Sequence, residues 1–194
     1  MKTTHLAIFA SGSGTNAEAI IRYFSGHPSI HVAGVLCNKA GAGVIERARR
    51  LSTPCRVFSR NDFTENGWVD QWLREHRVDY IILAGFLWLV PPFLVKAYPR
   101  RIINIHPALL PAYGGKGMYG DRVHQAVIAA GEKESGITIH RVDEIYDHGE
   151  ILFQASCPVY PDDSPQSLAQ RIHTLEHQFY PLIIERVIRE NARD

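Results

Sequence analysis

An asparagine and a histidine stand two residues apart at the end of one apolar strand, in the segment Asn104-Ile105-His106-Pro107. Ile103 and Ile105 alternate with them, so the amide and the imidazole leave the same strand face, roughly 6–7 Å apart by backbone. Pro107 ends the strand because it has no N–H to donate. An amide donor beside a proton carrier suits attack on a carbonyl group. The alternative is a buried Asn and His that only complete the packing of the strand end.

Two further polar residues could join this pair. Asp147 lies in a turn between two predicted strands, where its carboxylate could contact His106 and raise the pKa of the imidazole by favouring the charged form. A solvated turn aspartate is equally consistent with this stretch. His140 shares a strand face with Thr138, so it could line the same cleft or bond to backbone in the core.

A glycine-rich turn at residues 11–16 follows the first predicted strand and opens a helix. The N–H groups of such a turn and the positive helix end bind phosphate, and a tight turn without a ligand is the alternative. Gly12, Gly14 and Ala17 also fit the loose glycine pattern of dinucleotide enzymes. That pattern expects an acidic residue about 20 positions later, whereas the second strand ends in Cys37-Asn38-Lys39. A nicotinamide cofactor is therefore disfavoured.

A possible metal motif lies near the C-terminus. The segment His173-Thr174-Leu175-Glu176-His177 matches the inverted zinc-peptidase pattern H-x-x-E-H, and two histidines four apart share a helix face that could bind zinc. The sequence marks no third carboxylate ligand, and so short a pattern arises readily in a chain with 10 histidines. We therefore expect no metal site.

Strands and helices must position these residues. Up to residue 106, apolar runs alternate with amphipathic patterns at intervals of about 25 residues, which predicts βαβ units and a parallel sheet between helices. The predicted strands cover residues 5–10, 30–36, 55–58, 80–83 and 103–106, and the predicted helices cover 19–24, 41–51, 68–76 and 89–97. Strands at 137–140 and 151–160 are expected as antiparallel additions at one edge. The sequence thus predicts an α/β fold of three layers around a mostly parallel open sheet with antiparallel edge strands.

The regular alternation stops at residues 107–120, a glycine-rich stretch too long for a plain connector and therefore expected to be a functional loop. Asp121 is predicted to cap the helix that follows. Ser164, followed by proline, is predicted to cap a long amphipathic closing helix. Trp68 and Trp72 are predicted to face the core.

The composition is that of a soluble globular protein: 194 residues, 45% hydrophobic and 21% charged, with a formal net charge of +1. We expect one domain over residues 1–194. The near-neutral charge disfavours nucleic acid and membrane surfaces as partners. With no secretory leader before His5 and no apolar run long enough to span a bilayer, the expected location is cytoplasmic. The three cysteines are then expected to be reduced: Cys37, Cys55 and Cys157.

Several motifs together carry a family resemblance. They are Gly14-Thr15-Asn16, Ala84-Gly85-Phe86, Asn104-Ile105-His106-Pro107-Ala108-Leu109-Leu110-Pro111, Asp147-His148-Gly149 and Glu176-His177-Gln178-Phe179-Tyr180-Pro181. Over essentially all 194 residues the chain resembles the phosphoribosylglycinamide formyltransferase family, folate-dependent one-carbon transferases of purine (IMP) biosynthesis. The resemblance implies a Rossmann-like formyltransferase fold. It also implies transfer of the formyl group of 10-formyltetrahydrofolate to the amine of glycinamide ribonucleotide, without a metal, by a monomer or homodimer.

The resemblance also implies roles for the polar residues. Asn104 would donate to the oxyanion of a tetrahedral intermediate, and His106 would be the general acid and base. Asp147 would hold and charge His106, and His140 would support the cluster. The implied nucleotide-binding residues are Gly14, Thr15, Asn16, His173 and Glu176. The implied folate-binding residues are Arg60, Leu87, Trp88, Leu89, Val90, Asn104, Asp143 and Asp147.

The chain departs from the family pattern at three places. Trp88 stands where the family often has arginine, and His148 where it often has glycine. The loop at residues 114–120 is longer and richer in glycine, which suggests a lid with Lys116 reaching a substrate anion.

Three rival assignments remain. A formyltetrahydrofolate hydrolase usually carries an extra N-terminal regulatory domain, and a methionyl-tRNA formyltransferase an extra C-terminal one. Because the chain begins at the first strand and stops after one helix, both are disfavoured. A nucleotide-binding module would need only the glycine turn, and it would leave the Asn104, His106 and Asp147 side chains without roles.

Overall fold

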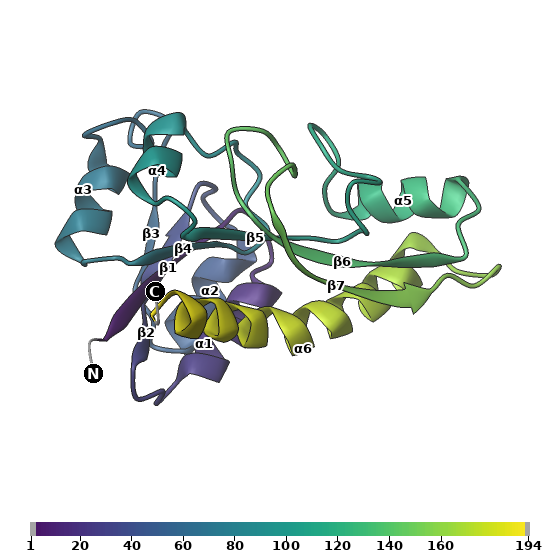
Figure 1. The fold of residues 1–194 in the computed structure, drawn as a ribbon, viewed down its shortest axis with the longest axis horizontal. Coiled ribbons are helices and arrows are strands. Elements are labelled where there is room, and N and C mark those ends of the chain that lie inside the picture. The colour runs from purple at the N-terminus through teal and green to yellow at the C-terminus, as the bar shows by residue number, and fades with distance from the viewer. Residues whose placement is uncertain (1–2, 193–194) are drawn as a thin grey trace. The chain divides into compact units, whose positions relative to one another are not determined.

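The structure, a computed structural model, describes residues 3–192 and contains a single seven-stranded sheet within that range (Figure 1). The strands are β1 (Thr4–Ala10), β2 (Ile30–Cys37), β3 (Cys55–Val57), β4 (Tyr80–Leu83), β5 (Ile102–His106), β6 (Glu134–Arg141) and β7 (Ile151–Pro158). The helices are α1 (Thr15–Phe24), α2 (Gly43–Arg50), α3 (Trp68–Glu75), α4 (Pro92–Ala97), α5 (Asp121–Ala129) and α6 (Pro165–Asn191). The strands are hydrogen-bonded in the order β3-β2-β1-β4-β5-β6-β7. The predicted mostly parallel α/β fold with antiparallel edge strands is confirmed.

The chain divides into two compact units, Met1–Ile103 and Asn104–Asp194, and the boundary falls within β5. Asn104 and His106, at the end of β5, belong to the second unit. That residues 1–194 act as one domain stays a prediction.

The first unit is built on parallel strands. β1 pairs with β2 on one side and β4 on the other, with Leu6 opposite Val32 and Tyr80, and β2 pairs with β3. Every β1 residue from Leu6 to Ala10 has no exposed surface. A strand covered on both faces tolerates no polar alternation, which explains why β1 and β4 are continuous apolar runs.

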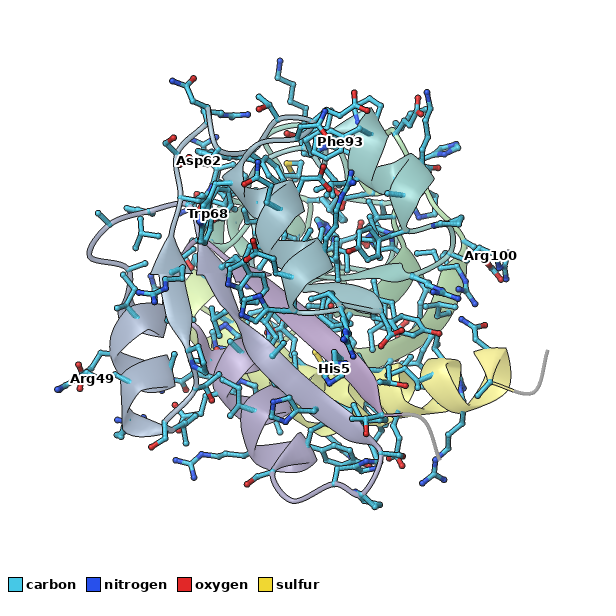
Figure 2. The ribbon with its side chains drawn as sticks, turned by 90° about the vertical axis from the view of Figure 1, so that its left-hand side faces the viewer. His5, Arg49, Asp62, Trp68, Phe93 and Arg100 are labelled. Atoms are coloured by element: carbon cyan, nitrogen blue, oxygen red, sulfur yellow. The ribbon has the colours of Figure 1, made fainter. Side chains whose placement is uncertain are left out.

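Besides shifts of two to four residues at the starts of α1 and α2, two departures from prediction concern α4 and α3. The fourth helix begins at Pro92, three residues later than predicted, because the residue before a proline avoids helical geometry and Pro91 is extended, with ψ of 145°. Trp72 is buried as predicted, but Trp68, at the start of α3, is 36% exposed (Figure 2). Its first-turn position leaves it outside the apolar face of α3.

The second unit contains an antiparallel hairpin with a long helix beside it. β6 pairs with β7, and the register shifts between Ile139 and His140. Helix α6 runs along β6 and β7 (Figure 1). Ser164 caps it, as predicted, by accepting from the N–H of Ser167 in a capping box. The prediction for Asp121 was wrong: Gly120 is the N-cap residue and Asp121 is the first helical residue.

No helix in the described part of the chain combines the length and the apolar character that crossing a membrane requires.

Candidate active site

Four polar side chains converge in the second unit. Asn104 and His106 come from β5, His140 from β6, and Asp147 from the loop that follows β6. The Nδ1 atom of His106 lies 3.5 Å from one oxygen of Asp147, and the Nε2 atom of His140 lies 3.6 Å from the other. The amide nitrogen of Asn104 lies 3.0 Å from His140 Nε2 and 3.4 Å from Asp147. The side chains that the sequence singled out are therefore within reach of one another across 43 residues.

A backbone carbonyl determines which ring nitrogen of His106 carries the hydrogen. Its Nε2 atom lies 2.7 Å from the carbonyl oxygen of Tyr113, which can only accept, so Nε2 carries the hydrogen. Tyr113 has a left-handed backbone, with φ of 56°, in the turn that presents this carbonyl. The lone pair of neutral His106 is therefore on Nδ1, the nitrogen that faces Asp147. Tyr113 could not be identified from the sequence, because its contribution is a main-chain atom.

Hydrogen-bond partners also determine which atoms of His140 and Asn104 donate and which accept. His140 Nδ1 donates to the Arg141 carbonyl at 2.8 Å, so its Nε2 accepts from the Asn104 amide at 3.0 Å. The second amide hydrogen of Asn104 has only the longer contact, 3.4 Å, to Asp147. This weaker contact is the one that an incoming oxyanion can replace at least cost.

Asp147 is held from two sides. Its backbone is left-handed, with φ of 54°, and one carboxylate oxygen accepts from the Gly115 N–H at 2.9 Å. Burial alone would raise the pKa of Asp147, but the contacts of its carboxylate with His140, His106 and the Gly115 N–H together bring that pKa below its usual value. The carboxylate is therefore ionised at neutral pH, and the glycine-rich loop is one of its supports.

A side-chain contact closes the loop that carries Asp147. One oxygen of Asp143 lies 2.8 Å from His148 Nδ1, and the other accepts from the Ile145 N–H at 2.8 Å. Both Asp143 and His148 are substantially exposed.

Asp147 raises the pKa of His106, as predicted, but a larger influence acts in the opposite direction. His106 is 4% exposed, and burial, the largest influence, lowers its pKa. Asp147 and the Tyr113 carbonyl raise the pKa, but not enough to offset burial. His106 is therefore neutral at neutral pH and able to accept a proton.

This balance gives a pH prediction. If neutral His106 accepts a proton, activity is lost as pH falls through the His106 pKa, so the acid limb lies below that of an ordinary histidine. Asp147→Asn removes the charge that raises this pKa, so the acid limb should move to still lower pH while turnover slows. The measurement is kcat/KM from about pH 5 to pH 9. A limb that moves to higher pH in Asp147→Asn would contradict the assignment.

Thr138 holds the segment that follows β5. It has no exposed surface, donates to the Ala108 carbonyl at 2.7 Å and accepts from the Leu110 N–H at 2.9 Å. Gln154 on β7 donates to both Thr138 Oγ1, at 2.9 Å, and the Leu110 carbonyl, at 3.0 Å. The strand pattern placed Thr138 on the face of His140, but its partners lie 16 to 30 residues away along the chain.

Thr138→Val should lower the free energy of unfolding by about 2–4 kcal/mol, because it leaves buried groups of residues 108 and 110 unpaired. Urea denaturation measures the change. Thr174→Val is the matched control, since the exposed Thr174 only bonds the Gln170 carbonyl one turn back on α6; it should change stability by less than about 0.5 kcal/mol. Equal effects in the two variants would contradict the role of Thr138.

The glycine turn lies in the first unit. Gly14 is the N-cap residue of α1 with a left-handed backbone, φ of 80°, and a Cβ there would lie 2.5 Å from the Val44 side chain. Only glycine fits this position. Since Gly14 has no side chain, the first N–H groups of α1, in Thr15 and Asn16, receive no cap from it and can face an anion.

Arg60 and residues 87–90 also lie in the first unit. The Arg60 guanidinium lies 3.9 Å from the ring centroid of Trp88, a cation–π contact. The Leu87 N–H donates to the buried Ser11 hydroxyl at 3.0 Å, which ties this segment to the end of β1. Leu87 and Leu89 are exposed and Val90 is buried.

His173 and Glu176 lie on α6 of the second unit. Glu176 is 5% exposed, and His173 is exposed. The rings of His173 and His177 stack with centroids 6.1 Å apart. Among residues 3–192, no group of three or more His, Cys, Asp or Glu side chains is arranged to hold a metal ion.

Comparison with known proteins shows the family to which the chain belongs. Residues 4–184 match the family model described as formyl transferase. The chain belongs to the formyl transferase family. It is 40% identical over 192 residues to the phosphoribosylglycinamide formyltransferase of Bacillus subtilis, covering 96% of each chain. It is 41% identical over 194 residues to the chloroplastic enzyme of that name from Arabidopsis thaliana, covering 97% of this chain but just under two thirds, 66%, of the plant protein.

Solved structures in the formyl transferase family share the fold. The crystal structure of phosphoribosylglycinamide formyltransferase from Anaplasma phagocytophilum superposes with a TM-score of 0.87 at 34% identity, covering 97% of this chain and 89% of the other. Family membership makes a folate the expected source of the formyl group.

Proposed function

We propose that this chain transfers the formyl group of 10-formyltetrahydrofolate to the amine of glycinamide ribonucleotide, a step of purine biosynthesis. One observation carries the proposal. In this member of the formyl transferase family, the Asn104 amide and the His106 imidazole lie 3.4 and 3.5 Å from the Asp147 carboxylate. An oxyanion donor, a proton carrier and a charge that stabilises the protonated carrier are the groups that acyl transfer to an amine requires.

The proposed chemistry follows from the hydrogen positions. The amine attacks the formyl carbon, a C–N bond forms, and the formyl oxygen becomes an oxyanion that accepts from Asn104. His106 takes the proton released by the amine and delivers it, directly or through water, to the folate nitrogen. The bond between that folate nitrogen and the formyl carbon breaks as the proton arrives. Ionised Asp147 stabilises the imidazolium in between, and His140 keeps the Asn104 amide oriented. The products are the formylated nucleotide and tetrahydrofolate.

The substrate contacts are part of the proposal. The nucleotide phosphate binds the N–H groups of Gly14, Thr15 and Asn16, and the ribose binds Glu176 and His173. The folate binds along Leu87, Trp88, Leu89 and Val90, with Asn104, Asp143 and Asp147, and Arg60 pairs with its glutamate tail. We also propose a cytoplasmic protein, a monomer or homodimer of single-domain chains, that acts without metal, nucleic acid or membrane.

The test is incubation of the purified chain with 10-formyltetrahydrofolate, with and without glycinamide ribonucleotide. Formylated nucleotide and tetrahydrofolate should appear in equal amounts, and only when both substrates are present. Formate release without the nucleotide would instead indicate a hydrolase. No turnover of the folate under either condition would indicate a binding module and overturn the proposal.

A further inference from the structure

Helix α2 packs against the back of the glycine turn in the first unit. The Val44 N–H donates to the Gly12 carbonyl at 3.1 Å, and the Val44 side chain leaves no room for a Cβ on Gly14. A Cβ on Gly43 would lie 3.1 Å from the Ser13 carbonyl oxygen. The turn and the first residues of α2 are therefore in close contact, so α2 can determine the conformation of the turn.

Arg47, one turn further along α2, bonds the turn directly. Its Nε donates to the Ser13 carbonyl at 2.9 Å, and its Nη1 donates to the Glu18 carboxylate on α1. Glu18 is largely buried and also pairs with Arg22 and Arg50, at 2.8 and 3.0 Å. The hydrogen bond from Arg47, with the charges of the other two arginines, lowers the pKa of Glu18 to about 2, so the carboxylate stays ionised and holds the Arg47 guanidinium in place.

The Ser13 contact matters because of peptide geometry. In a trans peptide the C=O of residue 13 and the N–H of residue 14 point in opposite directions. A Ser13 carbonyl held toward Arg47 therefore directs the Gly14 N–H away from α2, to the side where an anion would meet the turn. In addition, three guanidinium groups around one carboxylate leave excess positive charge beside the start of α1, which favours phosphate.

We infer that Arg47 is a positioning residue for the phosphate of the nucleotide substrate, acting through the Ser13 carbonyl to preset the N–H groups of the turn. The inference rests on the proposed function for the identity of the nucleotide. An ordinary surface ion pair is the competing explanation for the contact with Glu18, but it does not account for the second bond, to the main chain of the turn.

Arg49 supplies a matched control on the same helix. It pairs with Glu46 at 2.9 Å, as Arg47 pairs with Glu18, but it is 78% exposed and projects outward from α2 (Figure 2). Arg49→Ala thus removes a charge and an ion pair from α2 without touching the turn.

The experiment compares Arg47→Ala, Arg47→Lys and Arg49→Ala in the full chain, with each substrate varied in turn. In Arg47→Ala, KM for glycinamide ribonucleotide should rise about tenfold, while kcat and KM for the formyl folate stay within about twofold. Arg49→Ala should match the parent chain. Arg47→Lys keeps the charge but not the forked geometry, so it should not restore KM.

Inorganic phosphate, titrated directly onto each variant by calorimetry, gives a readout that needs no turnover. Its binding should weaken in Arg47→Ala and not in Arg49→Ala. An unchanged KM in an active Arg47→Ala variant overturns the inference and leaves the proposed function standing. Full restoration of KM in Arg47→Lys also overturns the inference. So does an Arg47→Ala variant in which kcat falls, both KM values rise and thermal stability drops together. If the parent chain forms no product, the proposed function fails. Phosphate binding that is weaker in Arg47→Ala but not in Arg49→Ala would even then support the role of Arg47.

Discussion

Replacing His106 with asparagine is expected to lower kcat by about 10²–10⁴-fold, the range that a positioned general acid and base contributes. The structure explains the size of the effect. His106 is neutral, its lone pair faces Asp147, and its other nitrogen is held by the Tyr113 carbonyl, so the ring is oriented before the substrate arrives. An asparagine can still donate to that carbonyl but cannot carry a proton. Single-turnover formyl transfer at saturating substrates measures the chemical step.

The control for this experiment is His31→Asn, which changes an exposed histidine on β2 and should leave kcat unchanged. Both variants should bind the two substrates with affinities close to those of the parent chain, because the lost function acts in the transition state. A folded His106→Asn protein with normal single-turnover rates would contradict the proton-carrier role.

The second large effect is expected for Asn104→Ala, a loss of about 10²–10³-fold in kcat, as for removal of one oxyanion donor. The amide hydrogen with the long contact to Asp147 is the proposed donor, and the hydrogen bonded to His140 fixes its direction. Unlike the His106 effect, this loss should be nearly the same across the pH range, since an amide does not titrate. Steady-state kcat at several pH values separates the two roles.

Asn61→Ala, a change to an exposed asparagine in the first unit, is the control for this prediction. If Asn104→Ala instead raised KM for the formyl folate and left kcat intact, Asn104 would be a binding residue and the oxyanion role would be wrong.

Local patterns determined most of the fold and the starting pair of the site. The strand ending at His106 could be predicted because residues of one face alternate and a proline cannot extend a strand. The cap at Ser164 could be predicted for the same kind of reason, since a hydroxyl before a helix-starting proline satisfies a nearby N–H. Where two local rules competed, as at Pro91 and Gly120, the boundary was missed by one to three residues.

Tertiary structure decided what those residues can do. The sequence placed Asp147 in a turn, but a left-handed backbone and the Gly115 N–H bring its carboxylate to His106. The sign of the His106 pKa shift was beyond the sequence, because burial depends on every segment packed around the ring, while a neighbouring charge can be guessed from one motif. The contributions of Tyr113 and Ser13 were invisible for a simpler reason. They act through main-chain carbonyls, which every residue has, and only the folded chain determines which carbonyl meets which side chain.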